Sequence, residues 1–162
     1  FGVKEYKGKY KNVDWFTYVH CKNEETLLQQ FFSFMNKYAP DVITGWNCQN
    51  FDLQYLINRS LNIFGDDSKI ANKLSPINNV RTWMTKEEEF SIDIAGITIL
   101  DYLDIYKWYS PTKLERYTLD YVSNYELEKG KVDYSQYKDL RTLYDENWDL
   151  YVEYNVIDDI VV

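Results

Sequence analysis

The chain has 162 residues, of which 45 % are hydrophobic and 18 % aromatic, and its formal charge is −8. This length suits one domain with a sizeable core, and so much aromatic surface excludes a disordered chain. No apolar run approaches the roughly 20 residues of a membrane span, and no signal peptide is recognisable, so we expect no membrane partner.

The acidic charge and the two cysteines indicate which partners and which redox compartment the chain suits. The isoelectric point is near 4.7, whereas a freestanding duplex-binding protein is usually basic. An acidic chain still handles DNA when its carboxylates gather metal ions or when a neighbouring domain holds the duplex. Cys21 and Cys48 have no His or Cys neighbour at metal-ligand spacing. This favours idle thiols in a reducing, cytoplasmic setting.

Alternating and helical patterns define the first half of the chain. Residues 13–21 alternate as in a strand, and Asn23 suits the N-cap of a helix that ends at Tyr38. Residues 42–46 form a β-branched run that is typical of a buried strand. The first helix is expected to bury Leu27, Leu28, Phe31, Phe32, Met35 and Tyr38.

The second half of the chain predicts a hairpin followed by helices. The predicted elements are a hairpin over residues 80–94, a strand over 97–100, and helices over 101–109, 118–127 and 145–162. The last helix is expected to turn Leu150, Tyr151, Tyr154, Ile157 and Val161 inward. The order of elements predicts an α/β fold with helices on both faces of a mixed sheet.

Asp52 lies at the junction between the central strand and the helix that follows it. Polar residues 47–50 break the strand pattern, and helical spacing of apolar residues begins at Leu53. Because ligands and metals bind at the carboxyl ends of strands in α/β proteins, Asp52 is a candidate site residue. The same position suits a helix N-cap, so both roles remain open.

Tyr154 and Asp158 form a second candidate pair, on the last predicted helix. Side chains four residues apart leave one helix face about 5–6 Å from each other. A phenol beside a carboxylate suits a site in which the carboxylate holds a divalent ion and the phenol orients a water. Oxygen ligands without His or Cys favour Mg²⁺ or Mn²⁺. The same spacing also occurs by chance on solvated helix faces.

Together these residues resemble the second and third exonuclease motifs of the family B DNA polymerases, in their 3′–5′ proofreading domain. The second motif is present as Ile43-Thr44-Gly45-Trp46-Asn47 with Phe51-Asp52, and the third as Tyr154-Asn155-Val156-Ile157-Asp158. Within the family, the pattern is nearest to that of the T-even-type bacteriophage replicative polymerases. The likeness continues through residues 62–65, 74–76, 96–102 and 117–121.

The resemblance implies an RNase H-like (DnaQ-like) α/β exonuclease fold with an inserted β-hairpin and two bound Mg²⁺ or Mn²⁺ ions. It implies that Asp52 holds the ion that stabilises the leaving 3′-oxygen. Asp158 would hold the ion whose bound water attacks the phosphorus, and Tyr154 would orient that water. The implied substrate is the 3′ end of a DNA primer, and the implied partners are the remaining polymerase domains.

Three further residues receive roles from the resemblance. Asn47 and Phe51 would shape the pocket for the terminal nucleotide, although Phe51 suits core packing equally well. Lys131 follows a glycine, as in the phage proteins, and would approach a phosphate; a solvated surface lysine is equally consistent with its position.

The first motif of the family, Asp-x-Glu on the first strand, is not found in the sequence, because no aspartate is followed two positions later by a glutamate. We therefore expect residues 1–162 to be a single-domain fragment of the exonuclease domain. Its N-terminal strand and first motif would lie upstream of Phe1, and the fragment would be inactive by itself. The alternatives are a freestanding exonuclease, which should carry its own Asp-x-Glu, and a non-catalytic RNase H-like module that binds single strands or a partner through tyrosines.

Overall fold

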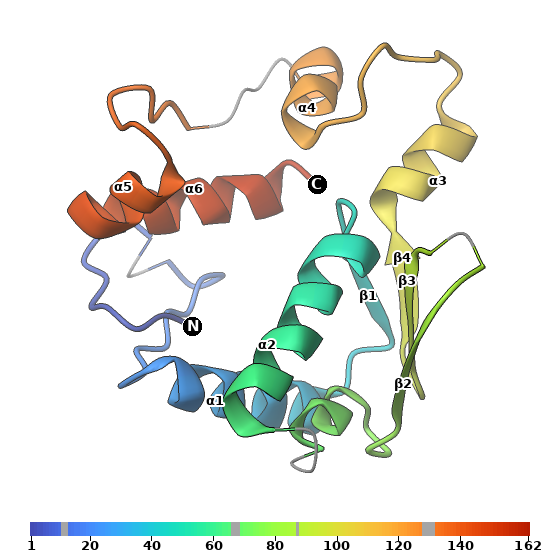
Figure 1. Cartoon of the computed structure of the whole chain (residues 1–162). Coiled ribbons are helices and arrows are strands. Elements are labelled where there is room, and N and C mark those ends of the chain that lie inside the picture. The colour runs from blue at the N-terminus through green and yellow to red at the C-terminus, as the bar shows by residue number, and fades with distance from the viewer. Residues whose placement is uncertain (11–12, 66–68, 87, 128–131) are drawn as a thin grey trace. The chain divides into compact units, whose positions relative to one another are not determined.

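The computed structural model describes residues 1–10, 13–65, 69–86, 88–127 and 132–162. The chain divides into two compact units, which we call the central unit, Glu24–Lys113, and the terminal unit, Phe1–Asn23 with Leu114–Val162. Each unit has its own cluster of buried hydrophobic residues. Figure 1 shows the path of the chain through both.

The central unit combines helices with two small sheets. Its elements are α1 (Glu24–Tyr38), β1 (Val42–Gly45), the π-helical turn η1 (Gln49–Leu53), α2 (Gln54–Phe64), the 3₁₀ turn η3 (Ile70–Leu74), β2 (Val80–Met84), β3 (Phe90–Ile94), β4 (Thr98–Asp101) and α3 (Tyr102–Tyr109). Strand β1 pairs in parallel with β4, and β2 pairs in antiparallel fashion with β3 (Figure 1). The described strands therefore form two two-stranded sheets, where the sequence predicts one mixed sheet.

The core of the central unit gathers around one face of α1. Leu28, Phe32 and Met35 recur at helical spacing and pack in one cluster with Ile57 of α2 and Ile94 of β3. These three positions confirm half of the predicted stripe, and Leu27 and Phe31 are partly buried against the same cluster. The prediction that Tyr38 is buried is wrong.

Tyr38 lies outside the core because the helix ends there. Its side chain is 62 % exposed and contacts the ring of Phe34 on the solvent side of α1, with centroids 4.5 Å apart. The next residue, Ala39, has a positive φ of 41° and turns the chain away from the helix axis. The aromatic pair at i and i+4 thus covers a surface turn rather than the core.

The terminal unit contains the helices α4 (Leu119–Leu127), α5 (Leu140–Glu146) and α6 (Trp148–Ile160). Its core forms where Tyr6, which is 2 % exposed, packs against Val152 and Val156 of α6. The rings of Phe16 and Tyr18 lie 5.8 and 5.3 Å from the ring of Tyr6. An N-terminal segment and a C-terminal helix therefore share one aromatic cluster.

The strand predicted over residues 13–21 is wrong. The described part of this segment makes one isolated parallel bridge, between Gly2 and His20. Gly2 donates to the Val19 carbonyl (3.0 Å) and accepts from the Cys21 N–H (2.8 Å). A strand requires a neighbour along its length, and here the neighbour is a single residue.

The helix predicted over residues 145–162 is wrong at its start, because two helices meet at Asn147. This residue leaves the helical region (φ −140°, ψ 78°), and its side chain accepts from the Leu150 N–H (3.1 Å) as the N-cap of α6. The buried face is confirmed in part: Tyr154 and Val161 are buried as predicted, whereas Leu150, Tyr151 and Ile157 are only half-buried. Val152 and Val156 are buried as well, because the N-terminal aromatic cluster and Tyr134 cover α6 on more than one side.

The strand predicted over residues 42–46 forms as β1, but it is not buried as predicted: Val42 is 45 % exposed and none of its four residues is buried, because β1 pairs only with β4 among the described strands. The remaining predicted elements are confirmed in the described residues. Helices α1, α3 and α4 match the predictions over 23–38, 101–109 and 118–127, and β2 with β3 matches the hairpin over 80–94. Thr118 accepts from the Tyr121 N–H (3.3 Å), as a cap for α4 should. No helix in these residues is long and apolar enough to cross a membrane.

Replacing Phe32 with alanine should destabilise the central unit by about 3–5 kcal/mol, because the side chain is fully buried and leaves a cavity. The matched control is F34A on the same helix, since Phe34 is 44 % exposed. Urea unfolding followed by circular dichroism measures both variants. Equal losses for the two variants would contradict the packing described for α1.

Candidate functional site

The turn between β1 and η1 is the best-defined candidate site. Asn47 holds a left-handed backbone conformation (φ 59°), which asparagine tolerates better than most residues. Cys48, 4 % exposed, then turns inward beneath the end of β1. A Cβ on Gly45 would lie 2.8 Å from the Cys48 Cβ, so glycine permits this close approach.

The π-helical turn η1 fixes the backbone on both sides of Asp52. The Phe51 N–H donates to the Asn47 carbonyl (3.1 Å), and the Leu53 N–H donates to the Cys48 carbonyl (2.9 Å). Leu53 is buried in the core, whereas Asp52 is exposed. Asp52 therefore lies at the strand-to-helix junction, as predicted. It does not cap α2, because the N-cap of that helix is Leu53 and it makes no side-chain cap bond.

Phe51 and Tyr55 present exposed rings beside Asp52. Phe51 is 69 % exposed and Tyr55, one helical turn later, is 59 % exposed. The core-packing alternative for Phe51 is therefore wrong. An exposed aromatic ring next to a surface carboxylate provides a face on which a nucleotide base could stack.

Asp101, at the end of β4, is a residue of this site that the sequence analysis did not identify. Its carboxylate accepts from the Asn47 N–H (2.9 Å) and from the Gln49 N–H (3.1 Å). The sequence pattern assigns Asp101 to the following helix. The feature that points to a site residue is an aspartate directly after a strand and before a helix.

Cys48 is an inert thiol within this turn. Burial raises its pKa to about 12, and the negative charges of Asp101 and Asp52 add to this effect. Cys21 and Cys48 are both free and buried, as the sequence predicts for idle thiols.

Tyr154 and Asp158 lie one turn apart on α6, as their spacing predicts. Tyr154 is 8 % exposed, and its ring meets Tyr134 edge-on with centroids 5.4 Å apart. Asp158 is half-buried. The adjacent Asp159 has a raised pKa, because the surrounding protein partly desolvates its carboxyl group and because the Asp158 charge lies nearby.

The predicted site residues belong to different units. Asn47, Phe51 and Asp52 are in the central unit, and Tyr154 and Asp158 are in the terminal unit. Lys131 lies outside the described residues. In the part of the chain that the structure describes, no three His, Cys, Asp or Glu side chains form a group that could hold a metal ion.

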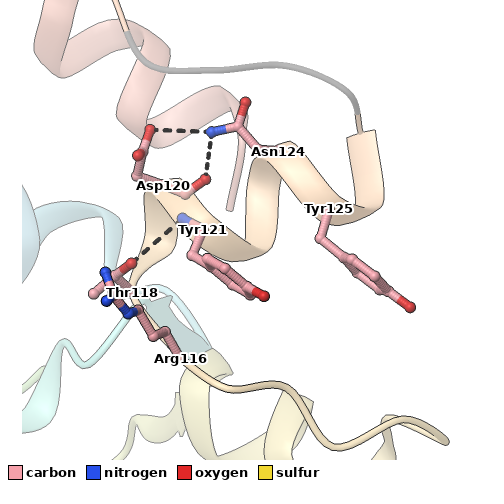
Figure 2. A pocket seen from close by; sticks show the side chains of 6 residues that line it. All are labelled: Arg116, Thr118, Asp120, Tyr121, Asn124 and Tyr125. Carbon is pink, nitrogen blue, oxygen red and sulfur yellow. Dashed lines mark hydrogen bonds between the residues drawn. The ribbon is translucent and has the colours of Figure 1, made fainter.

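A surface pocket lies at the start of α4 in the terminal unit. Its lining residues are Arg116, Thr118, Asp120, Tyr121, Asn124 and Tyr125. Figure 2 shows the rings of Tyr121 and Tyr125 pointing the same way from successive turns of α4, on the side away from Asp120 and Asn124. The Asn124 amide donates to the Asp120 carbonyl (2.7 Å) and to its carboxylate (3.3 Å). Two tyrosines and an arginine therefore share one open surface.

Comparison with known proteins decides the family of the chain. Residues 3–122 match the family model described as DNA polymerase family B, exonuclease domain. The chain belongs to this family. The matched residues include Asn47, Phe51 and Asp52 and end before α6, so this match does not bear on Tyr154 and Asp158.

Individual relatives of this exonuclease-domain chain are whole polymerases. It is 37 % identical over 149 residues to the DNA-directed DNA polymerase of Escherichia phage RB69, covering 90 % of the chain and 16 % of the relative. The DNA-directed DNA polymerase of Enterobacteria phage T4 is 34 % identical over 151 residues, with the same coverages. The DNA polymerase delta catalytic subunit of Plasmodium falciparum is 33 % identical over 139 residues, covering 80 % of the chain and 12 % of the relative. The chain thus spans about a sixth of the length of the phage polymerases.

Replacing Gly45 with alanine should destabilise the turn by about 1–3 kcal/mol, because the new methyl group overlaps the Cys48 Cβ. The variant C48G removes that Cβ, so G45A should be better tolerated in the C48G background by more than about 0.5 kcal/mol. Urea unfolding of the four combinations measures this coupling. Additive losses would show that the two positions do not meet.

Proposed function

We propose that residues 1–162 form one domain-sized portion of an RNase H-like 3′–5′ exonuclease within a larger DNA polymerase. Its substrate would be the 3′ end of a DNA primer, and its partners the remaining polymerase domains. The family match over residues 3–122 carries this proposal, since it spans the turn that bears Asp52. In this fold the antiparallel β2–β3 pair is an inserted hairpin.

Asp52 and Asp158 are the carboxylates that would hold Mg²⁺ or Mn²⁺. Carboxylate oxygens are the hard ligands that these ions prefer, so the donor chemistry fits. When bound, a pair of such ions supplies Lewis-acid stabilisation of the leaving oxygen and a water acidic enough to attack at neutral pH. The exposure of Asp52 and its fixed backbone support its assignment.

Four other residues act on the substrate and the water in this proposal. The Tyr154 hydroxyl orients the attacking water. Packing of the Tyr154 ring against Tyr134 holds this hydroxyl in place. The exposed ring of Phe51 stacks on the terminal base, and the Asn47 side chain contacts its sugar or phosphate. Lys131 approaches a phosphate.

The chain by itself is expected to be a poor nuclease. The family resemblance assigns two further metal carboxylates to an Asp-x-Glu pair, and the sequence has no such pair. Two carboxylates hold divalent ions weakly, because affinity for hard cations rises with the number and charge of the ligands.

Incubation of residues 1–162 with a 5′-labelled single-stranded oligonucleotide and Mg²⁺ or Mn²⁺ should release little or no nucleotide from the 3′ end. The products are resolved on a denaturing gel, with an EDTA-treated sample as the control. Robust metal-dependent shortening from the 3′ end would contradict the requirement for the additional carboxylates.

A second candidate function is binding of single-stranded DNA without cleavage. The observation that favours it is the surface of Arg116, Tyr121 and Tyr125, of which Tyr125 is 54 % exposed. Stacking of a base on an aromatic ring contributes about 1–3 kcal/mol. Metal-independent binding of a labelled single-stranded oligonucleotide, measured by fluorescence anisotropy and lost in the double variant Y121A/Y125A, would support this function.

In the polymerase that carries this chain, D52N and D158N should each lower 3′–5′ exonuclease activity by more than about 100-fold and leave polymerisation unchanged. The reason is that loss of a metal ligand exceeds the 10–100-fold effect of losing a group that only supports a ligand. The controls D41N and D145N remove an exposed carboxylate from each unit. Primer degradation and primer extension are measured in parallel. Full exonuclease activity in D52N and D158N would reject the site assignment.

A further inference from the structure

The carboxylate of Asp101 lies where three elements of the central unit meet. Asp101 is the last residue of β4 and pairs in register with Gly45, the last residue of β1. Figure 1 shows these two strands side by side, with α3 following β4. The side chain of Asp101 therefore leaves β4 beside the turn that begins at Trp46.

Both oxygens of Asp101 are hydrogen-bonded to backbone donors. Oδ1 accepts from the Asn47 N–H (2.9 Å) and from the Leu103 N–H of α3 (3.1 Å). Oδ2 accepts from the Gln49 N–H (3.1 Å). Hydrogen bonds to an ionised acceptor are roughly twice as strong as those between neutral groups. One carboxylate thus holds two alternate peptide groups of the turn and the first turn of α3.

The residues that Asp101 holds are those that fix Asp52. Asn47 donates its N–H to Asp101, and its carbonyl accepts from the Phe51 N–H. Cys48 lies between the two residues bound by Asp101, and its carbonyl accepts from the Leu53 N–H. The N–H groups of Phe51 and Leu53, the residues on either side of Asp52, are therefore tied to Asp101 through one intervening layer of hydrogen bonds.

We propose that Asp101 is a positioning residue of the exonuclease site, which sets the direction of the Asp52 carboxylate by fixing the turn over residues 47–49. Asp101 does so without contacting DNA or metal ions. The inference rests on the proposed function, because it assigns Asp101 to the same site. A displacement of about 1 Å at a reacting group lowers a rate by about 100-fold, so releasing the turn that Asp101 holds at Asn47 and Gln49 has a direct catalytic consequence.

Capping of α3 is the competing role of Asp101, and two variants separate it from positioning. Serine caps helices about as well as aspartate, but its single, shorter hydroxyl cannot serve Leu103 and the turn together. D101S therefore keeps the cap and releases the turn. D101N keeps one oxygen and places an NH₂ donor against the Gln49 N–H, so it breaks that bond selectively.

Each variant has a matched control. D139S changes another helix-capping aspartate, which accepts from the Thr142 N–H (2.8 Å) at the start of α5 and does not contact the turn. D104N removes a carboxylate from the first turn of α3 at an exposed position. A loss that arises from capping or from net charge would appear in the controls as well.

The first measurement is amide hydrogen exchange of residues 1–162 by NMR. D101S should raise the exchange rates of the Asn47 and Gln49 amides by about 10-fold or more, because a bond to a charged acceptor contributes about 1.5–3 kcal/mol. The amides of Phe51 and Leu53 should follow them, while D139S leaves all four unchanged. Unchanged protection at Asn47 and Gln49 in D101S would overturn the inference.

The second measurement is steady-state exonuclease kinetics in the polymerase that carries the chain. D101S and D101N should lower kcat by about 10- to 100-fold, because they disturb the geometry of the reacting groups. KM should stay within about two-fold, because Asp101 does not contact the substrate. D139S and D104N should retain the wild-type kcat.

The outcomes distinguish this inference from the proposed function. A wild-type kcat in D101S, or an equal fall in D139S, would overturn the positioning role while the proposed exonuclease stands. A wild-type polymerase that does not degrade a primer would reject the proposed function instead. Even then, the hydrogen-exchange result decides whether Asp101 holds the turn that bears Asp52.

Discussion

Strands β1 and β4 pair in register over four residues, and the last pair sets Gly45 opposite Asp101. This alignment brings a carboxylate beside the two N–H groups of the turn that leaves β1, where they would otherwise need water or a distant partner. It also brings Cys48 so close to Gly45 that a side chain at position 45 would block the turn. The pairing of two short parallel strands is thus the constraint that fixes the turn leading to the exposed Asp52.

The acidic composition is consistent with a DNA polymerase exonuclease domain, because several of its carboxylates have structural roles. Asp101 and Asp139 accept backbone N–H bonds, and Glu24 forms a bidentate pair with Arg59 that holds the pKa of Glu24 below its usual range. Asp52 is exposed at a turn whose backbone is already satisfied by other groups. Aspartates that accept backbone N–H bonds stabilise helix starts, whereas an exposed carboxylate on a fixed turn can reach a ligand in solvent.

The sequence predicted elements well where the signal is local. Helix α1 follows from a capping position and from apolar residues at helical spacing, and the hairpin of β2 and β3 follows from alternation around a charged tip. The predictions over residues 13–21 and 145–162 failed for non-local reasons. A strand needs a neighbour that sequence alternation does not reveal, and the break at Asn147 depends on one side chain capping α6 instead of continuing the helix.

The sequence by itself determined the family motifs, the position of Asp52 at a strand-to-helix junction and the spacing of Tyr154 and Asp158. These are properties of residue type and local order. Only the tertiary structure decided that Phe51 is exposed and that Asp101 holds the turn. The physical reason is distance along the chain, because Asp101 and Asn47 are 54 residues apart and meet through the pairing of β1 with β4.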